Sequence, residues 1–284
     1  MVLFTHIEDA SPIGTLGSVQ SRDNYLITRS KMIGMADLSL THGLQWVLQP
    51  DWKFLEAARI YEDATVTADT GGKNFFRYLH EDLGVVIDPH SHENGGYNYT
   101  DVAFLLEQLG VGGSTVIGGH IWDPALPQFQ EWDRFRNAVP GLMYPAASWQ
   151  GDILIGAGTP AHVNDPLVSG VWRPRDRDHF FADDPTANIV VVGAWHDELT
   201  GVQELVDLYA SGTVPADVML TASWNITPVS ITALNGLADI ETAVLAPIAK
   251  LRDAGSVVVT DFPSLVATWK SAYGGDASIY QPSP

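Results

Sequence analysis

Short apolar runs alternate with amphipathic segments along the whole chain, which predicts alternating strands and helices. Nine runs have the composition of strands: residues 2–7, 44–49, 85–88, 114–121, 152–156, 168–172, 188–194, 217–224 and 256–261. The runs VVID, STVIG, NIVVVGAW and SVVVTDF are almost continuously apolar, as in strands that are buried on both faces. This pattern predicts a parallel sheet that is wrapped by helices.

Helical periodicity is clearest in the middle of the chain. Val102, Leu105, Leu106 and Leu109 fall at i, i+3, i+4 and i+7, and Gly110 follows as a stop. These positions predict one amphipathic helix.

Two further helices are predicted toward the C-terminus. Residues 244–251 place their apolar side chains on one face and end before Gly255, although Pro247 implies a kink or a late start. Pro263 suits the first turn of a last helix that carries Leu265.

Eight or so strand–helix units without a linker predict an α/β protein built as one (β/α) barrel over residues 1–284, possibly distorted or seven-stranded. A doubly wound sheet is the alternative, but neither G-x-G-x-x-G nor a P-loop is present. Two long loops, 10–24 and 157–184, are expected over the barrel mouth, where long loops are usually functional.

Charge and composition narrow the possible partners. The formal net charge is −19, which disfavours binding to nucleic acid and to anionic membranes. No apolar run is long enough for a membrane span, and Met1 is not followed by a signal-peptide pattern. We therefore expect either a cytoplasmic protein or a secreted one whose leader was removed. The oligomeric state is not predicted.

Candidate chemistry is concentrated in the segment PHSHE. His90 and His92 lie two residues apart at the end of a predicted strand, so both imidazoles can point to one face. Neutral imidazole is the commonest metal ligand, and the absence of cysteine restricts any metal to nitrogen and oxygen ligands. The alternative is a pair of polar histidines at a strand end. We expect a divalent cation here, with zinc first.

The active site of a barrel lies at the C-terminal ends of its strands. Several predicted strand ends carry polar or aromatic residues: His6, Glu8 and Asp9; His90 and His92; His120, Trp122 and Asp123; Arg173; Trp195, His196 and Asp197; Trp224 and Asn225. Their number predicts one convergent site.

The acidic pair Glu8–Asp9, the His90–Ser91 step and the W-R-P sequence at 172–174 resemble motifs of the polysaccharide deacetylases. These are metal-dependent carbohydrate esterases with a distorted (β/α) barrel. The resemblance implies that Glu8 is the general base, that Asp9 and His90 bind the metal, and that Arg173 orients the base.

The chain departs from that family pattern at two positions. Glu8 stands where the family usually has Asp, and Asn94 occupies the place of the second histidine. Either His92 takes over that ligand role, or Asn94 leaves the site weaker.

Strand geometry leaves a further choice open. Adjacent residues of a regular strand point to opposite faces, so Glu8 and Asp9 converge only if the strand breaks before Ser11. If the strand does not break, His6 and Glu8 share the face and Asp9 is a bystander.

The remaining candidates each have two interpretations. His196 is a general acid for the leaving group or a structural histidine. Arg173 orients Glu8 or pairs with local acids. His120, Trp122, Trp195 and Trp224 are walls of a sugar cleft or core residues.

We expect a metal-dependent hydrolase that removes acyl groups, acetyl above all, from a carbohydrate or another small acylated substrate. One alternative is a different metal-barrel hydrolase, such as an amidohydrolase-like lactonase or amidase. Another is a non-catalytic carbohydrate-binding barrel.

Overall fold

The structure is a computed structural model, and it describes residues 1–119, 131–155, 167–195 and 198–281. Its strands are β1 (Val2–Ile7), β2 (Trp46–Pro50), β3 (Val86–Ile87), β4 (Val116–Ile117), β5 (Val139–Pro140), β6 (Ser148–Trp149), β7 (Ile153–Ile155), β8 (Ser169–Trp172), β9 (Val190–Val192), β10 (Ser223–Asn225) and β11 (Ser278–Tyr280).

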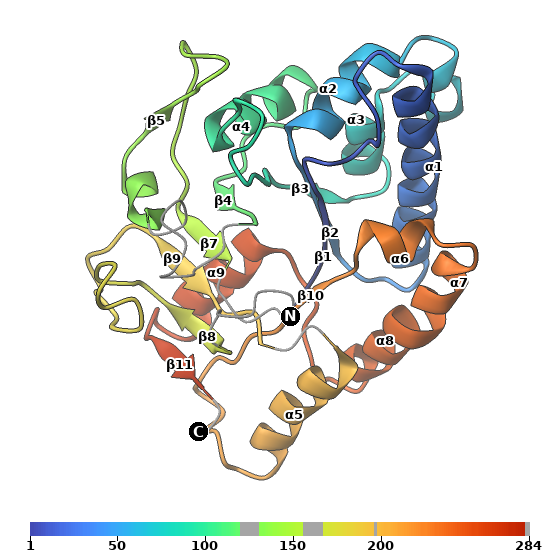
Figure 1. Ribbon diagram of the computed structural model, residues 1–284. Helices are drawn as coiled ribbons and strands as arrows, with labels where there is room; N and C mark the ends of the chain where they lie inside the picture. The colour runs from blue at the N-terminus through green and yellow to red at the C-terminus, as the bar shows by residue number, and fades with distance from the viewer. Residues whose placement is uncertain (120–130, 156–166, 196–197, 282–284) are drawn as a thin grey trace.

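The helices are α1 (Val19–Thr41), α2 (Trp52–Tyr61), α3 (Phe75–Glu81), α4 (Tyr99–Gln108), α5 (Leu199–Ala210), α6 (Pro228–Thr232), α7 (Gly236–Ile240), α8 (Ala246–Asp253) and α9 (Phe262–Ala272). Short 3₁₀ segments form η1 (Val66–Thr70) and η3 (Trp132–Arg136), and η4 (Glu241–Leu245) is a π-helical turn. Figure 1 shows α1 to α4 and α6 to α8 outside β1, β2 and β3, with α9 close to β7 and β9.

The chain is an α/β protein with two larger sheets. One sheet has the order β10-β1-β2-β3, and all its strands are parallel. The second has the order β11-β8-β9-β7-β4. In it β4, β7 and β9 are parallel, whereas β8 and β11 each run antiparallel to their neighbours. The expectation of parallel strands is therefore wrong for β8. The apolar pattern of a strand does not reveal whether it runs parallel or antiparallel to its neighbours.

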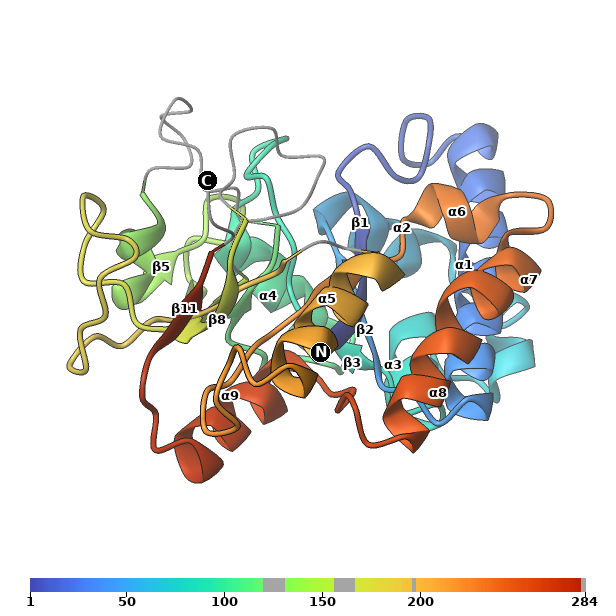
Figure 2. The ribbon, with the colours of Figure 1, turned by 90° about the horizontal axis from the view of Figure 1, so that it is seen from below.

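Hydrogen bonds join the two sheets at two places. A parallel bridge between His90 and Gly118 places the continuation of β3 beside β4. At the other edge of the first sheet, Ser223 N at the start of β10 donates to Ala194 O at 2.8 Å; Ala194 lies two residues after β9, an interior strand of the second sheet. Figure 2, seen from below, shows β8 and β11 on the opposite side of the molecule from α1, α7 and α8.

The predicted helices are present. α4 covers the 102–109 pattern, and Gly110 follows it with a φ of 83°. Helical backbone runs without a break through α7, η4 and α8, so the expected late start at Pro247 is wrong: Pro247 lies directly after the π-helical turn η4, which accommodates it inside the helix. Pro263 lies in the first turn of α9.

Three expectations about the remaining segments are wrong. Residues 256–261 are not a strand. They contact the chain start through Val258 O, which accepts from the Met1 amino group, and through Thr260 N, which donates to Met1 O. Because β1 is flanked by β2 and β10, it has no open edge with which these residues could pair. The expected loop 10–24 is also shorter, since α1 begins at Val19; the loop expected over 157–184 contains β8.

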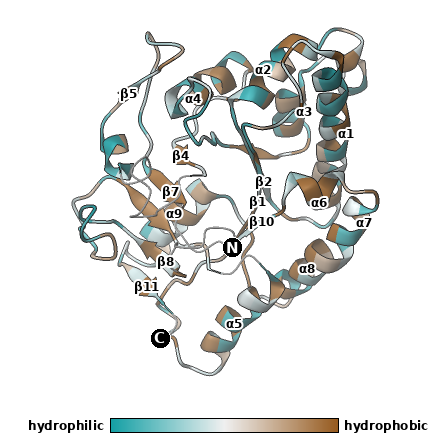
Figure 3. Ribbon diagram, viewed as in Figure 1, coloured by the Kyte–Doolittle hydropathy of each residue, from teal (hydrophilic) through white to brown (hydrophobic). Residues whose placement is uncertain are grey.

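The core lies on both sides of the strands, and successive side chains of β1 point to opposite sides. Leu3 belongs to a large cluster shared with α1 to α4, while Phe4 belongs to a cluster shared with the other strands and α9. The rings of Phe4 and Phe262 are 6.0 Å apart. Figure 3 shows β7 and β9 largely hydrophobic and α1 largely hydrophilic over its visible surface. Side chains two residues apart share a face, so Phe4 fixes the direction taken by His6 and Glu8.

None of the described helices combines the length and the apolar character needed to cross a bilayer.

One buried carboxylate ties α4 to the turn of the β5–β6 hairpin. Asp101 is fully buried and accepts the backbone N–H groups of Leu142, Met143 and Tyr144 at 2.8 to 3.1 Å. It also accepts the N–H of Asn98, whose side chain caps α4 in return. A carboxylate with several amide donors is a strong anchor.

We predict that Asp101→Asn destabilises the protein by about 3 kcal/mol, because the amide group turns an N–H toward buried N–H donors. Urea unfolding measures the change. Glu107→Gln on the exposed side of the same helix is the matched control and should stay within about 0.5 kcal/mol. An Asp101→Asn protein as stable as this control would contradict the assignment.

Candidate metal centre

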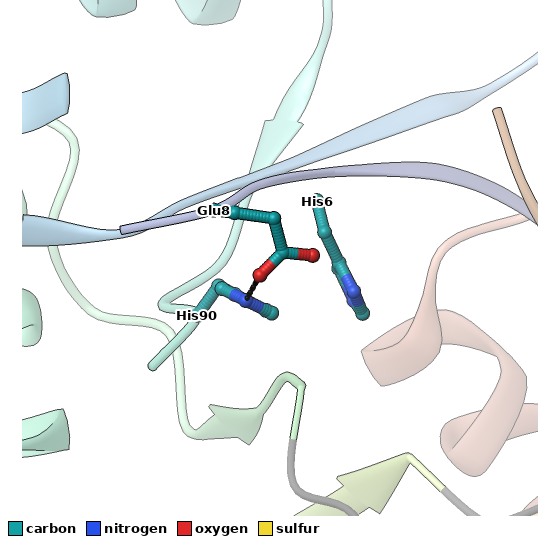
Figure 4. Close-up of side chains that lie close together, drawn as sticks. All are labelled: His6, Glu8 and His90. Atoms are coloured by element: carbon teal, nitrogen blue, oxygen red, sulfur yellow. Dashed lines mark hydrogen bonds and ion pairs between the residues drawn. The ribbon is translucent and has the colours of Figure 1, made fainter. Parts of the chain in front are cut away.

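Two strands of the parallel sheet, β1 and β3, bring polar side chains to one place at their C-terminal ends, on either side of β2. β1 supplies His6 and, one residue beyond the strand, Glu8. The segment after β3 supplies His90. Figure 4 shows His6 and Glu8 leaving the same side of the β1 segment and pointing toward His90.

These three residues form a group that can hold a metal ion. One ligand atom from each of His6, Glu8 and His90 lies within 4.8 Å of the other two. Glu8 Oε2 is 3.0 Å from His90 Nε2, and the rings of His6 and His90 are 4.1 Å apart. His92 adjoins the group, since its Nδ1 is 3.3 Å from the same Glu8 oxygen.

Burial and charge suit cation binding. His90 is fully buried and His6 is 8% exposed, whereas the Glu8 side chain is 44% exposed at the mouth of the site. Burial, together with the charge of His90, lowers the pKa of His6 well below its usual range, so its imidazole is neutral, which is the form that binds metal.

Glu8 is held in its ionised form. Burial raises the pKa of this carboxyl, but its interactions with the nearby histidines, foremost the hydrogen bond from His90, outweigh this effect and lower the pKa to about 2. The site thus combines neutral and anionic ligands.

One buried ring nitrogen supports the fit to a metal. His6 Nε2 has no hydrogen-bond partner among the described residues, whereas His90 turns its Nε2 toward Glu8 and its own unpartnered nitrogen, Nδ1, lies beside Gly119. Buried polar atoms without partners are rare in native proteins and are often explained by an ion or water. The donor set is nitrogen and oxygen, which fits zinc and other divalent ions without selecting one of them.

Glycines make room for the ring of His90. A Cβ built on Gly119 would lie less than 3.0 Å from that ring, and one on Gly118 equally close to Gln49. Gly119 also has a φ of 75°. The glycine pair after β4 is therefore a structural part of the site, which the sequence reasoning missed although VIGGH is visible in the chain.

Asp9 does not belong to the group of three ligands. β1 continues regularly to Ile7, so His6 and Glu8 share the face, as in the second of the two alternatives left open by the sequence. Asp9 lies instead near Asp51, whose pKa its charge helps to raise.

Asp51 is a further acidic residue that the sequence reasoning missed. It follows β2 directly and is fully buried. Burial raises its pKa to about 6, although the charge of His90 acts in the opposite direction. The strand-end rule that selected the other candidates would have found it, since it follows the run WVLQP.

Arg173 is engaged away from Glu8. Its guanidinium donates to Asp183 at 3.0 and 3.2 Å and to Gly275 O at 2.8 Å, and it lies over the ring of Trp269. It therefore pairs with a local acid, as its second interpretation had it, and not with the expected base.

The expected sugar-binding residues are placed in part. Trp224 packs against the cluster shared with the helices, in register with Leu3, and so lies on the face opposite to His6. Trp195 is buried in the same cluster with a φ of 55°, and its ring is 5.4 Å from that of Tyr280. His120, Trp122 and His196 lie outside the described residues.

Neither the family models nor the curated protein sequences with which we compared the chain match it. The case for a function therefore rests on the geometry of this site.

We predict that His6→Ala and Glu8→Gln each weaken Zn²⁺ binding by more than about tenfold, since loss of even an outer partner of a ligand costs that much. Isothermal titration of metal-free protein measures the affinity. Asp9→Asn removes the adjacent carboxylate and should bind Zn²⁺ like the wild type. The opposite pattern, with Asp9 essential and His6 dispensable, would restore the assignment implied by the family resemblance.

We also predict that Gly119→Ala weakens Zn²⁺ binding by about tenfold or more, because the new methyl group displaces the ring of His90. Gly113→Ala is a matched control: Gly113 also has a positive φ, of 103°, but has open space around its Cβ position. Both variants should lose some stability from backbone strain, so equal Zn²⁺ affinities in the two would rule out the steric role of Gly119.

Proposed function

We propose that this protein is a metal-dependent hydrolase that removes acyl groups, acetyl above all, from a carbohydrate. The observation that carries the proposal is the group of His6, Glu8 and His90 at the C-terminal ends of parallel strands. Hydrolases that activate water with a metal commonly use three such ligands and leave another position open.

His6, Glu8 and His90 would hold the ion, with His92 beside Glu8 as a further candidate. We propose zinc. When bound, a divalent ion lowers the pKa of water toward about 7 and polarises a carbonyl oxygen. The protein's own contribution is to fix the two imidazoles in a buried place and to leave Glu8 at its mouth.

We further propose that the strands form a distorted barrel. Support comes from the hydrogen bonds between the two sheets at both edges of the first sheet, at His90–Gly118 and at Ser223–Ala194. In addition, β1, β2, β4, β7, β8 and β9 contribute side chains to one common cluster, as inward-facing residues of a barrel do.

An aromatic pair near the site is suited to a sugar ring. Trp52 follows Asp51 directly, and its ring is stacked on that of Tyr97 at 4.4 Å with an interplanar angle of 4°. Both side chains are partly buried. We propose this pair as a sugar platform in place of Trp224, because flat aromatic surfaces pack well against sugar rings.

A second candidate is an amidohydrolase-like lactonase or amidase. The feature that favours it is the placement of His6 and Glu8 two residues apart at the end of β1, since that group usually carries its His-x-His pair on the first strand. The choice of substrate separates the two candidates.

We predict that Zn²⁺-loaded protein releases acetate from acetylated oligosaccharides and that treatment with a chelator abolishes this activity. Glu8→Gln should lower turnover by at least about 10²-fold, in parallel with its loss of metal. A panel of acetylated sugars, lactones and amides, followed by acid release, is the measurement. Hydrolysis of lactones alone would favour the second candidate, whereas sugar binding without turnover or metal would indicate a non-catalytic barrel.

A further inference from the structure

Asp51 occupies a central position in the site. Its backbone N–H donates to Ile7 O at 2.9 Å, and the preceding carbonyl, Pro50 O, accepts from His90 N at 3.3 Å. The residue is thus fixed between the segment that leads to Glu8 and the segment that carries His90.

The two oxygens of the Asp51 carboxylate have different surroundings. Oδ1 accepts the N–H of Trp52 at 2.6 Å and so caps α2. Oδ2 has no hydrogen-bond partner among the described residues, although the side chain is fully buried. A buried carboxylate oxygen without a donor is costly, and a functional role is one of the few explanations for keeping it.

Asp51 is near the metal group but not part of it. The group whose atoms lie within 4.8 Å of one another contains His6, Glu8 and His90 and no atom of Asp51. Its carboxylate nevertheless feels the charges of His90 and Asp9, and the backbone N–H of His92 lies close enough to lower the pKa of this carboxyl. This placement fits a group that acts on a bound water or acyl group from outside the ligand set.

Glu8, by contrast, is committed to the ligand group. Its Oε2 lies between His90 Nε2 and His92 Nδ1, at 3.0 and 3.3 Å. The base role that the family resemblance assigns to Glu8 therefore needs another carboxylate.

We propose that Asp51 is the general base of the hydrolase, through Oδ2. The proposal rests on the proposed function. As the oxygen of water bonds to the acyl carbon, one proton of that water passes to Asp51 Oδ2. When the bond from the acyl carbon to the sugar oxygen or nitrogen breaks, this proton passes to the leaving atom. The products are a carboxylic acid and a free hydroxyl or amino group, and Asp51 is again ionised.

Asp51→Asn is the decisive variant, because its amide oxygen can still cap α2 while the position of Oδ2 becomes an NH₂ group. We expect Zn²⁺ affinity within about threefold of the wild type and turnover lower by about 10² to 10⁴-fold, the range for loss of a general base. Asp37→Asn, on an exposed part of α1, should leave both unchanged. In Asp51→Ala, added formate should restore part of the turnover, which a purely structural role of Asp51 would not allow.

A second measurement does not depend on turnover. Acetohydroxamate binds divalent metals and presents a donor group near the acyl position, so its affinity for Zn²⁺-loaded protein should fall about tenfold or more in Asp51→Asn, as expected when one hydrogen bond to a charged group is lost. Calorimetry of wild type and variant measures this. If the wild type hydrolyses no acyl sugar but shows this difference, the substrate assignment fails while the position of Asp51 is supported.

Two outcomes would overturn the proposal. Loss of Zn²⁺ by Asp51→Asn would make Asp51 a ligand. Turnover and acetohydroxamate affinity at wild-type levels in Asp51→Asn would remove it from the chemistry.

Discussion

The site depends on the burial of one imidazole. His90 is fully enclosed, with Glu8 on its Nε2, the ring of His6 beside it and Gly119 against its edge. A polar ring in such a place must be compensated by partners, and only Nε2 has one among the described residues. The pairing register of β1, β2 and β3 brings these partners together, because parallel strands end at the same side of a sheet.

The sequence predicted the parallel sheet that carries the site well where its strands are distinct apolar runs between amphipathic segments. β1 was predicted at its observed bounds, and His90 and Glu8 do lie together. The sequence left open whether His6 or Asp9 joins Glu8 in the site, because this depends on whether the strand breaks after Ile7. Local composition around Ser11 does not decide that, whereas the pairing of Ile7 with Pro50 in β2 does.

Other elements escaped prediction for identifiable reasons. The 23-residue helix α1 has almost no amphipathic pattern, because its buried face includes Ser21, Thr28 and Arg29. Arg29 is buried through ion pairs with Glu62 and Asp69, contacts across 33 and 40 residues that no local pattern reveals. The direction of β8 was likewise set by long-range pairing with β9 and β11.

The anchoring of the hairpin turn by Asp101 has a consequence for how this protein can vary. The carboxylate binds backbone amides of residues 142–144, while the side chains of Leu142 and Met143 are 64% and 46% exposed. Since every residue except proline offers the same amide, the identity of these side chains is decoupled from the anchorage. The exposed side chains of this turn can therefore vary during evolution, or in a designed library, while Asp101 still holds the backbone of the turn against α4.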